Sequence, residues 1–128
     1  MGQRTNEADI AAVIEVVRAY YDGMIEGDAA KLGRAFHPRA SIVGNEGGGL
    51  SWSTLEEFTA ECEGAVSKAG PYEWRIERLS FEGDTALVTL GGQFAGVWYS
   101  DDLSLVWADE AWRIVHKTFY PHPSAGTA

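Results

Sequence analysis

Two polar residues near the C-terminal end of the chain, Asp101 and His116, have types and spacing suited to proton transfer. Each lies in an alternating segment typical of a β-strand, and a polar turn at Asp109-Glu110 joins the two segments into a hairpin. With that turn as the loop, Leu103 faces His116, and Asp101 lies diagonal to the histidine at about 7 Å along the backbone. A carboxylate beside an imidazole on an apolar face could abstract a proton next to a carbonyl group, or protonate a leaving hydroxyl group. Ligand orientation without chemistry, and a structural hydrogen bond between the strands, are the alternatives.

The same register assigns the neighbouring aspartate a different role. It places Asp102 opposite Lys117 on the other face of the hairpin, as a cross-strand ion pair. The facing of Trp107 and Trp112 supports this register, because a slip of one residue would mix polar and apolar side chains on both faces. We therefore predict that Asp101 and His116 are the catalytic candidates, and that Asp102 is structural.

Composition limits the kind of protein. The chain has 128 residues, of which 45% are hydrophobic and 12% aromatic, so a single folded domain is expected. The net charge of −9, with no basic patch, argues against nucleic acid as a partner. Cys62 is the only cysteine, and we expect it to be buried on a helix. The N-terminal residues lack the apolar run of a signal peptide, and no segment is apolar enough to span a membrane, so we expect a cytoplasmic protein without a membrane partner.

Three helices are predicted in the first half of the chain. Apolar residues at helical spacing predict a helix from about Glu7 to Glu26. Asp28 can cap a second, shorter helix, which ends at His37 before a proline. A capping box that begins at Ser53 and includes Glu56 predicts the third helix.

The rest of the chain is predicted to be mostly β-structure. A short strand covers Ala40–Gly44, and after residue 72 the alternation continues to the end, with a change of phase near Glu77-Arg78 that indicates a β-bulge. Three helices packed on one side of a curved antiparallel sheet would form an α+β layer with a conical cavity. We expect one domain over residues 1–128, with a core of about 8–120 and a flexible tail over 121–128.

Four local strings, in this order of elements, resemble the nuclear-transport-factor-two-like superfamily, also called the cystatin-like α+β roll. The superfamily includes ketosteroid isomerase, scytalone dehydratase and SnoaL-like polyketide cyclases, and the closest resemblance is to its putative lumazine-binding-like branch. The strings are Tyr20 seven residues before Gly27-Asp28, Phe36-His37-Pro38-Arg39-Ala40, Asp101-x-Leu103-x-Leu105, and Trp112-Arg113-Ile114-Val115-x-Lys117.

The resemblance has implications for individual positions. Tyr20 matches the tyrosine that donates a hydrogen bond to the developing enolate in the isomerases, and Asp101 lies on the strand face of their protonated acid. Their general base would fall near Gly44, and glycine cannot act as a base. The chain is therefore not an orthodox ketosteroid isomerase, and any chemistry would need another base. The superfamily also pairs through the outer face of its sheet, where we expect Trp98, Val106, Val115 and Phe119, so a homodimer is expected.

These observations predict a protein that binds a small apolar or aromatic molecule in the cone. It could be a cofactor-independent isomerase, dehydratase or cyclase; a non-catalytic binder and a dimeric structural or interaction domain are the alternatives. No cofactor is expected, and no metal, because the three histidines are dispersed along the chain. The candidate ligand-binding residues are Tyr20, Tyr99, Trp52, Phe58 and Trp74.

Overall fold

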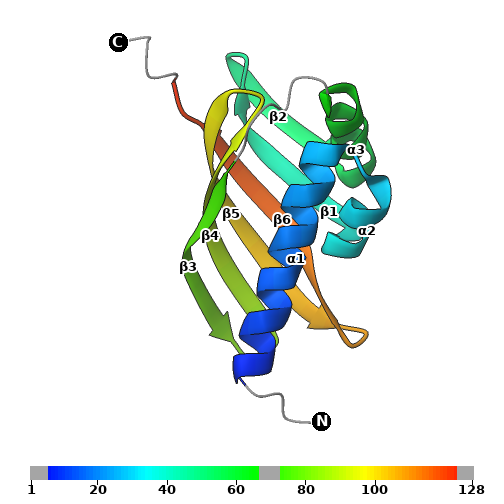
Figure 1. The fold of residues 1–128 in the computed structure, drawn as a ribbon, viewed down its shortest axis with the longest axis vertical. Coiled ribbons are helices and arrows are strands. Elements are labelled where there is room, and N and C mark those ends of the chain that lie inside the picture. The colour runs from blue at the N-terminus through cyan, green and yellow to red at the C-terminus, as the bar shows by residue number, and fades with distance from the viewer. Residues whose placement is uncertain (1–5, 67–72, 124–128) are drawn as a thin grey trace.

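The computed structural model describes residues 6–66 and 73–123, and folds them into three helices and six strands (Figure 1). In chain order the elements are α1 (Asn6–Glu26), α2 (Ala29–Ala35), β1 (Phe36–Glu46), β2 (Gly49–Thr54), α3 (Leu55–Gly64), β3 (Trp74–Glu82), β4 (Thr85–Phe94), β5 (Val97–Ala108) and β6 (Ala111–Pro121). Residues 124–128 of the expected flexible tail lie outside the described residues, whereas Pro121 still pairs with Tyr99 on β5. No helix in the described ranges is long and apolar enough to cross a membrane.

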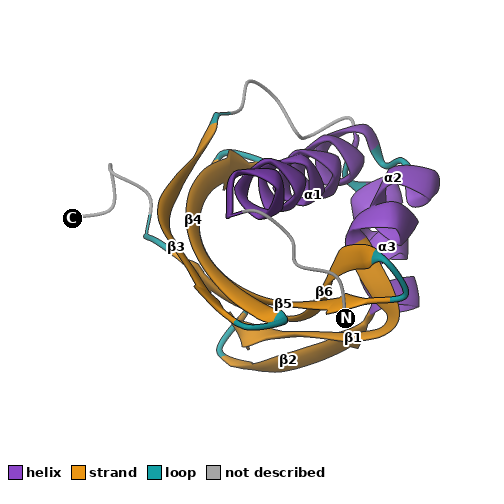
Figure 2. Ribbon diagram, turned by 90° about the horizontal axis from the view of Figure 1, so that it is seen from below, coloured by secondary structure: helices purple, strands orange, loops and turns teal. Residues whose placement is uncertain are grey.

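The six strands form one bent sheet that curves around α1 (Figure 2). Their order is β2-β1-β6-β5-β4-β3, and the three helices lie on one side of the sheet. The predicted α+β roll is therefore confirmed. The expectation of a purely antiparallel sheet is wrong, because β1 and β6 pair in parallel. Strands β2 to β5 come between these two strands in the sequence, and β6 then runs beside β1 in the same direction.

The strand registers shift at three places in the described sheet, one of them between Phe36 and Ser41 where β1 pairs with β6. The predicted bulge near Glu77-Arg78 is confirmed by a register shift between Ile76 and Arg78 on β3. A second shift lies between β5 and β6, where Leu105 pairs with Ile114 but Ser104 pairs with His116, so that Val115 is the extra residue. An extra residue in one strand reverses which side chains face the core beyond it. The second bulge therefore changes the orientation of every β6 side chain after Val115.

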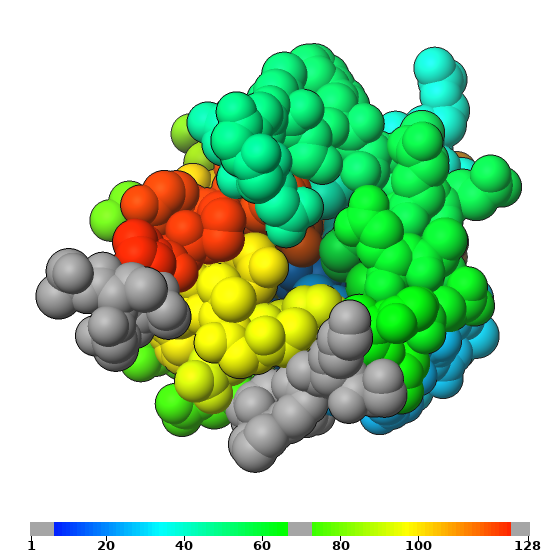
Figure 3. Space-filling model, turned by 90° about the horizontal axis from the view of Figure 1, so that it is seen from above, coloured from blue at the N-terminus to red at the C-terminus, as the bar shows by residue number. Residues whose placement is uncertain are grey.

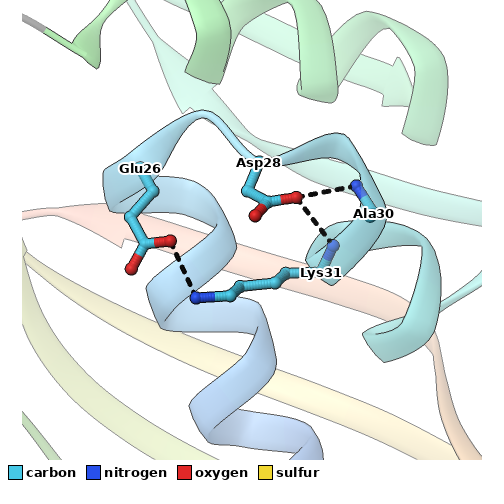
Figure 4. Close-up of polar contacts among 4 residues, drawn as sticks. All are labelled: Glu26, Asp28, Ala30 and Lys31. Carbon is cyan, nitrogen blue, oxygen red and sulfur yellow. Dashed lines mark hydrogen bonds and ion pairs between the residues drawn. The ribbon is translucent and has the colours of Figure 1, made fainter.

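The N-terminal caps of the two shorter helices are formed by side chains. Asp28 accepts hydrogen bonds from the backbone of Ala30 and Lys31 at 3.0 and 3.2 Å, and Lys31 pairs with Glu26 at 2.7 Å (Figure 4). The capping box of α3 uses Thr54 and Glu57, one residue later than predicted, because the preceding residues continue as strand β2. Phe36 likewise begins β1, where the sequence pattern predicted a helix end.

The core is the space between α1 and the concave face of the sheet. Tyr20 and Tyr21, both 1% exposed, are the largest side chains that α1 contributes to it. A Cβ atom on Gly92 of β4 would overlap the Tyr21 hydroxyl group, so only glycine leaves room for that ring. Cys62 of α3 is buried in the same core, as expected.

Candidate functional site

A cavity of about 80 Å³ lies at one end of the roll, between the helices and the concave face of the sheet. The space-filling view shows its hollow mouth, framed by the β1–β2 hairpin, α3, the β4–β5 turn and the end of β6, with atoms of α1 at its floor (Figure 3). Most of the walls are apolar or aromatic. They are formed by Tyr21, Met24, Ile42, Phe58, Phe94, Tyr99 and Phe119.

Three polar side chains meet at the wall of this cavity. The Tyr20 hydroxyl group donates a hydrogen bond of 2.6 Å to Oδ2 of Asp101. The same phenol oxygen accepts a hydrogen bond of 2.7 Å from Nζ of Lys117. All three side chains are buried, and the two ionisable groups at the ends of the set, Asp101 and Lys117, are of opposite sign. The result is a chain of hydrogen bonds from ammonium through phenol to carboxylate.

The ammonium group of Lys117 is also surrounded by aromatic rings. Its Nζ lies 4.4 Å from the ring centre of Phe58, 4.8 Å from that of Tyr20 and 5.5 Å from that of Phe119. Ring faces attract a cation within about 6 Å, and the attraction increases when the group is removed from water. These rings and the phenol oxygen together hold the Lys117 side chain at the cavity wall.

Asp101 retains one carboxylate oxygen without a partner. Its Oδ1 atom is buried and has no hydrogen bond to any of the described residues. Burial raises the pKa of Asp101, and the nearby Lys117 ammonium and the Tyr20 hydrogen bond partly oppose that rise. Burial and the Asp101 charge raise the pKa of Tyr20 well above its ordinary value, so the phenol stays protonated and remains a donor. Asp101 therefore has one oxygen held by Tyr20 and one oxygen without a partner among the described residues.

Acidic side chains lie at the rim of the cavity. Glu46 at the end of β1 and Glu61 on α3 both line the opening. Partial burial and then the Glu46 charge raise the pKa of Glu61. Burial, followed by the charges of Glu46 and Asp101, raises the pKa of Tyr99 on the opposite wall. A ligand that enters the cavity thus passes a rim of negative charge.

The structure separates the predicted catalytic pair. His116 pairs with Ser104 in the sheet, and its Nδ1 atom lies 2.7 Å from Oγ of Ser41 on the outer face. The expected contact between Asp101 and His116 is therefore wrong. The physical reason is the bulge at Val115, which turns His116 outward.

The same bulge also overturns the expected ion pair between Asp102 and Lys117. Asp102 pairs with Thr118 in the sheet and accepts a hydrogen bond of 3.0 Å from the Thr89 hydroxyl group. Lys117 faces inward and reaches Tyr20. Sequence reasoning therefore missed Lys117 as a site residue.

Three of the five predicted ligand-binding residues line the cavity, namely Tyr20, Phe58 and Tyr99. Their ligand contacts remain predictions. Trp52 and Trp74 do not line the cavity, so the prediction that they contact a ligand there is wrong. Trp52 is 68% exposed, because its neighbours Ser51 and Ser53 take the inward positions of β2. Trp74 packs against Tyr21 outside the cavity wall, with ring centres 5.8 Å apart.

Gly44 has a steric reason to be glycine. A Cβ atom there would lie 2.6 Å from the backbone oxygen of Phe119 and 2.8 Å from its ring. No side chain fits at this position while Phe119 forms part of the cavity wall. Within the described parts of the chain, no three His, Cys, Asp or Glu side chains cluster as metal ligands would.

The arrangement provides a hydrogen-bond acceptor and hydrogen-bond donors on one wall of an aromatic cavity. Asp101 can accept a hydrogen bond or a proton at Oδ1. Lys117 uses one N–H on Tyr20 and can donate another to an oxygen of a bound molecule. Tyr20 fixes the orientation of both groups.

Comparisons with known proteins agree with this architecture. The model of the family described as "Putative lumazine-binding" matches residues 8–120. A crystal structure of an NTF-2 like protein of unknown function from Silicibacter pomeroyi DSS-3 is 33% identical and covers 93% of this chain and 100% of its own, with a TM-score of 0.89. NTF2-like proteins of unknown function from Shewanella baltica OS155 (21% identity, 95% and 100% covered, TM-score 0.87) and Methylobacillus flagellatus KT (25%, 96% and 99%, 0.80) are also similar. No curated protein matches the sequence.

Proposed function

This chain belongs to the putative lumazine-binding family of NTF2-like proteins, and on that premise we propose that it binds a small, uncharged, largely apolar molecule in the Tyr20–Asp101 cavity. The resemblance drawn from its sequence motifs is thereby confirmed. The single observation that carries the proposal is the free Oδ1 atom of Asp101, a buried acceptor on the wall of an aromatic cavity. Leaving a buried polar atom unpaired costs about 1–3 kcal/mol, and a bound donor would remove that cost.

The proposal predicts that binding depends on the inward residues of β2 and not on their outward neighbours. Ser53→Phe places a ring in the cavity and should abolish binding of small aromatic molecules, whereas Trp52→Ala changes the outer surface and should leave binding intact. Chemical-shift titration of the labelled chain with a set of single-ring compounds measures this. Retention of binding in Ser53→Phe, together with a folded spectrum, would contradict a ligand site in this cavity.

A second candidate function, cofactor-independent proton transfer, is favoured by the environment of Asp101. Burial raises the pKa of its carboxyl group, which makes the carboxylate a stronger base than an exposed aspartate. Lys117 can donate a hydrogen bond to an oxygen on which negative charge develops. Isomerase, dehydratase and cyclase chemistry all begin with such a step, and Asp101 would supply the base that Gly44 cannot.

We also propose that two copies of the chain pair through the outer face of the sheet. Large apolar side chains are exposed where β2, β1 and β6 lie side by side: Leu50 at 67%, Trp52 at 68% and Tyr120 at 55%. Phe119 was predicted to lie on this outer face, but it lines the cavity instead. Buried Cys62 is compatible with the reducing conditions of the cytoplasm, which stays the predicted location.

The dimer proposal predicts the effect of a charge on that face. Trp52→Arg should convert a dimer into a monomer of 13.9 kDa, because a buried, unpaired guanidinium is costly at an apolar interface. Ile10→Arg, on the exposed side of α1, is the control and should leave the mass unchanged. Light scattering coupled to gel filtration measures both. A wild-type mass of one chain at high protein concentration would refute the dimer.

A further inference from the structure

The two open polar groups of the cavity specify the chemistry of the molecule that would satisfy them. Asp101 Oδ1 has no partner among the described residues. Lys117 carries three N–H donors, one of which donates a hydrogen bond to Tyr20. Both side chains bind the same phenol oxygen, so their open sites lie close together.

We infer that the ligand is an uncharged single-ring lactam or cyclic imide. Its N–H group donates to Oδ1 of Asp101, and its adjacent carbonyl oxygen accepts a hydrogen bond from Nζ of Lys117. The inference rests on the proposed binding function and names the ligand class for the same cavity.

Charge excludes the simpler alternatives. A carboxylate ligand would satisfy Lys117 but would face the Asp101 carboxylate and pass Glu46 and Glu61 at the rim. An ammonium ligand would satisfy Asp101 but would face Lys117. A neutral edge that carries one donor and one acceptor satisfies both groups without adding charge.

Geometry favours two adjacent ligand atoms over one. The position between the Lys117 ammonium and Oδ2 of Asp101 is already occupied by the Tyr20 hydroxyl group. A second hydroxyl group would repeat the contact that Tyr20 makes. The open acceptor is the other carboxylate oxygen, and an N–H with its neighbouring C=O offers the donor and the acceptor as two separate ligand atoms.

The size of the cavity suits a ligand of about one ring. Its volume of about 80 Å³ is enough for several water molecules. The walls above the polar groups are the rings of Phe58, Tyr99 and Phe119, against which a flat ring packs well.

The test compares three single-ring probes by chemical-shift titration of the full chain. They are 2-pyridone, which has the N–H and C=O edge; N-methyl-2-pyridone, which lacks the donor; and toluene, which lacks both. We expect 2-pyridone to bind at least about tenfold more tightly than the other two. In Asp101→Asn the Tyr20 bond holds the amide oxygen and the NH₂ group faces the ligand, so this preference should disappear; Lys117→Met should also remove it. Glu26→Gln, at an exposed position of α1 that does not line the cavity, is the matched control and should keep the preference.

Each outcome separates this inference from the proposed function. Equal affinity for 2-pyridone and its N-methyl derivative, or tighter binding of toluene, would overturn the lactam inference while the binding function stands. Retention of the preference in a folded Asp101→Asn variant would overturn it as well. Binding of none of the probes, nor of any other single-ring compound, would overturn the binding function itself.

Discussion

Replacing Lys117 by methionine is expected to lower the free energy of unfolding by about 3 kcal/mol at neutral pH, because it leaves the Asp101 carboxylate buried without a compensating cation. Methionine is an unbranched apolar side chain without the ammonium group that lies over the rings of Phe58 and Phe119, so the loss reports mainly on charge. Denaturant unfolding monitored by fluorescence measures the difference. Lys31→Met removes an exposed ion pair with Glu26 and should cost much less stability than Lys117→Met.

The destabilisation should depend on pH with a definite sign. The pKa of Asp101 is raised in the folded state, so its contribution to stability is fully present below the unfolded pKa of about 3.9 and is lost as pH rises through the folded pKa. Lys117 opposes the rise, and without it the folded pKa is higher and the loss is larger. The deficit of Lys117→Met should therefore be small near pH 4 and grow toward neutral pH.

A double variant tests whether the two charges act together. Asp101→Asn combined with Lys117→Met replaces both charges by neutral side chains and should recover most of the lost stability. If Lys117→Met were as stable as the wild type at neutral pH, or if its deficit did not change with pH, Lys117 would not compensate the Asp101 charge.

The register shifts on β3 and β6 show what can be predicted from the sequence and what cannot. On β3 the phase change is visible, because the apolar pairs Trp74/Ile76 and Leu79/Phe81 mark the inward side before and after it. On β6 the residues around the bulge are Val115, His116 and Lys117, and either polar residue could face inward. The pattern therefore predicts an uninterrupted register, which places His116 in the cavity instead of Lys117.

The parts of the fold that could be predicted rest on strong local signals. The periodicity of α1, the Asp28 cap and the Asp109-Glu110 turn are fixed by neighbouring residues, and both turn residues have the positive φ angles of a tight hairpin, 53° and 61°. The parallel pairing of β1 with β6 depends on contacts between segments far apart in sequence, whereas β2 follows β1 directly in a hairpin that the sequence pattern did not mark. The aromatic wall was partly predictable for the same reason: Phe58 and Tyr20 lie on helix stripes, whereas the inward phase of β2 was not marked by apolar residues.

If the chain catalyses proton transfer, the Asp101→Asn variant is expected to lose about 10²–10⁴-fold in rate, the contribution typical of a positioned general base. A suitable probe is 3-cyclohexenone, a single-ring ketone whose double bond moves into conjugation. Asp101 Oδ1 would take the proton from the carbon between the carbonyl group and the double bond. The electrons of that C–H bond form a dienolate, whose oxygen accepts a hydrogen bond from Lys117. The carboxylic acid then returns the proton to the far end of the diene.

Ultraviolet absorbance of the conjugated ketone follows the reaction, with Glu26→Gln as the surface control. A wild-type rate equal to that of buffer would exclude this chemistry for enones, and an unchanged rate in Asp101→Asn would exclude Asp101 as its base.

The pH profile of this reaction distinguishes a base from a residue that only supports the fold. The rate should rise with pH through the raised pKa of Asp101, because only the carboxylate accepts a proton. Tyr20→Phe removes a hydrogen bond that lowers this pKa, so the rising limb should move to higher pH while the plateau rate persists above it. A variant that merely loosened the fold would lower the rate at every pH and leave the midpoint unchanged. A shift of the midpoint to higher pH therefore requires that the group titrating in the reaction is the carboxylate that Tyr20 holds.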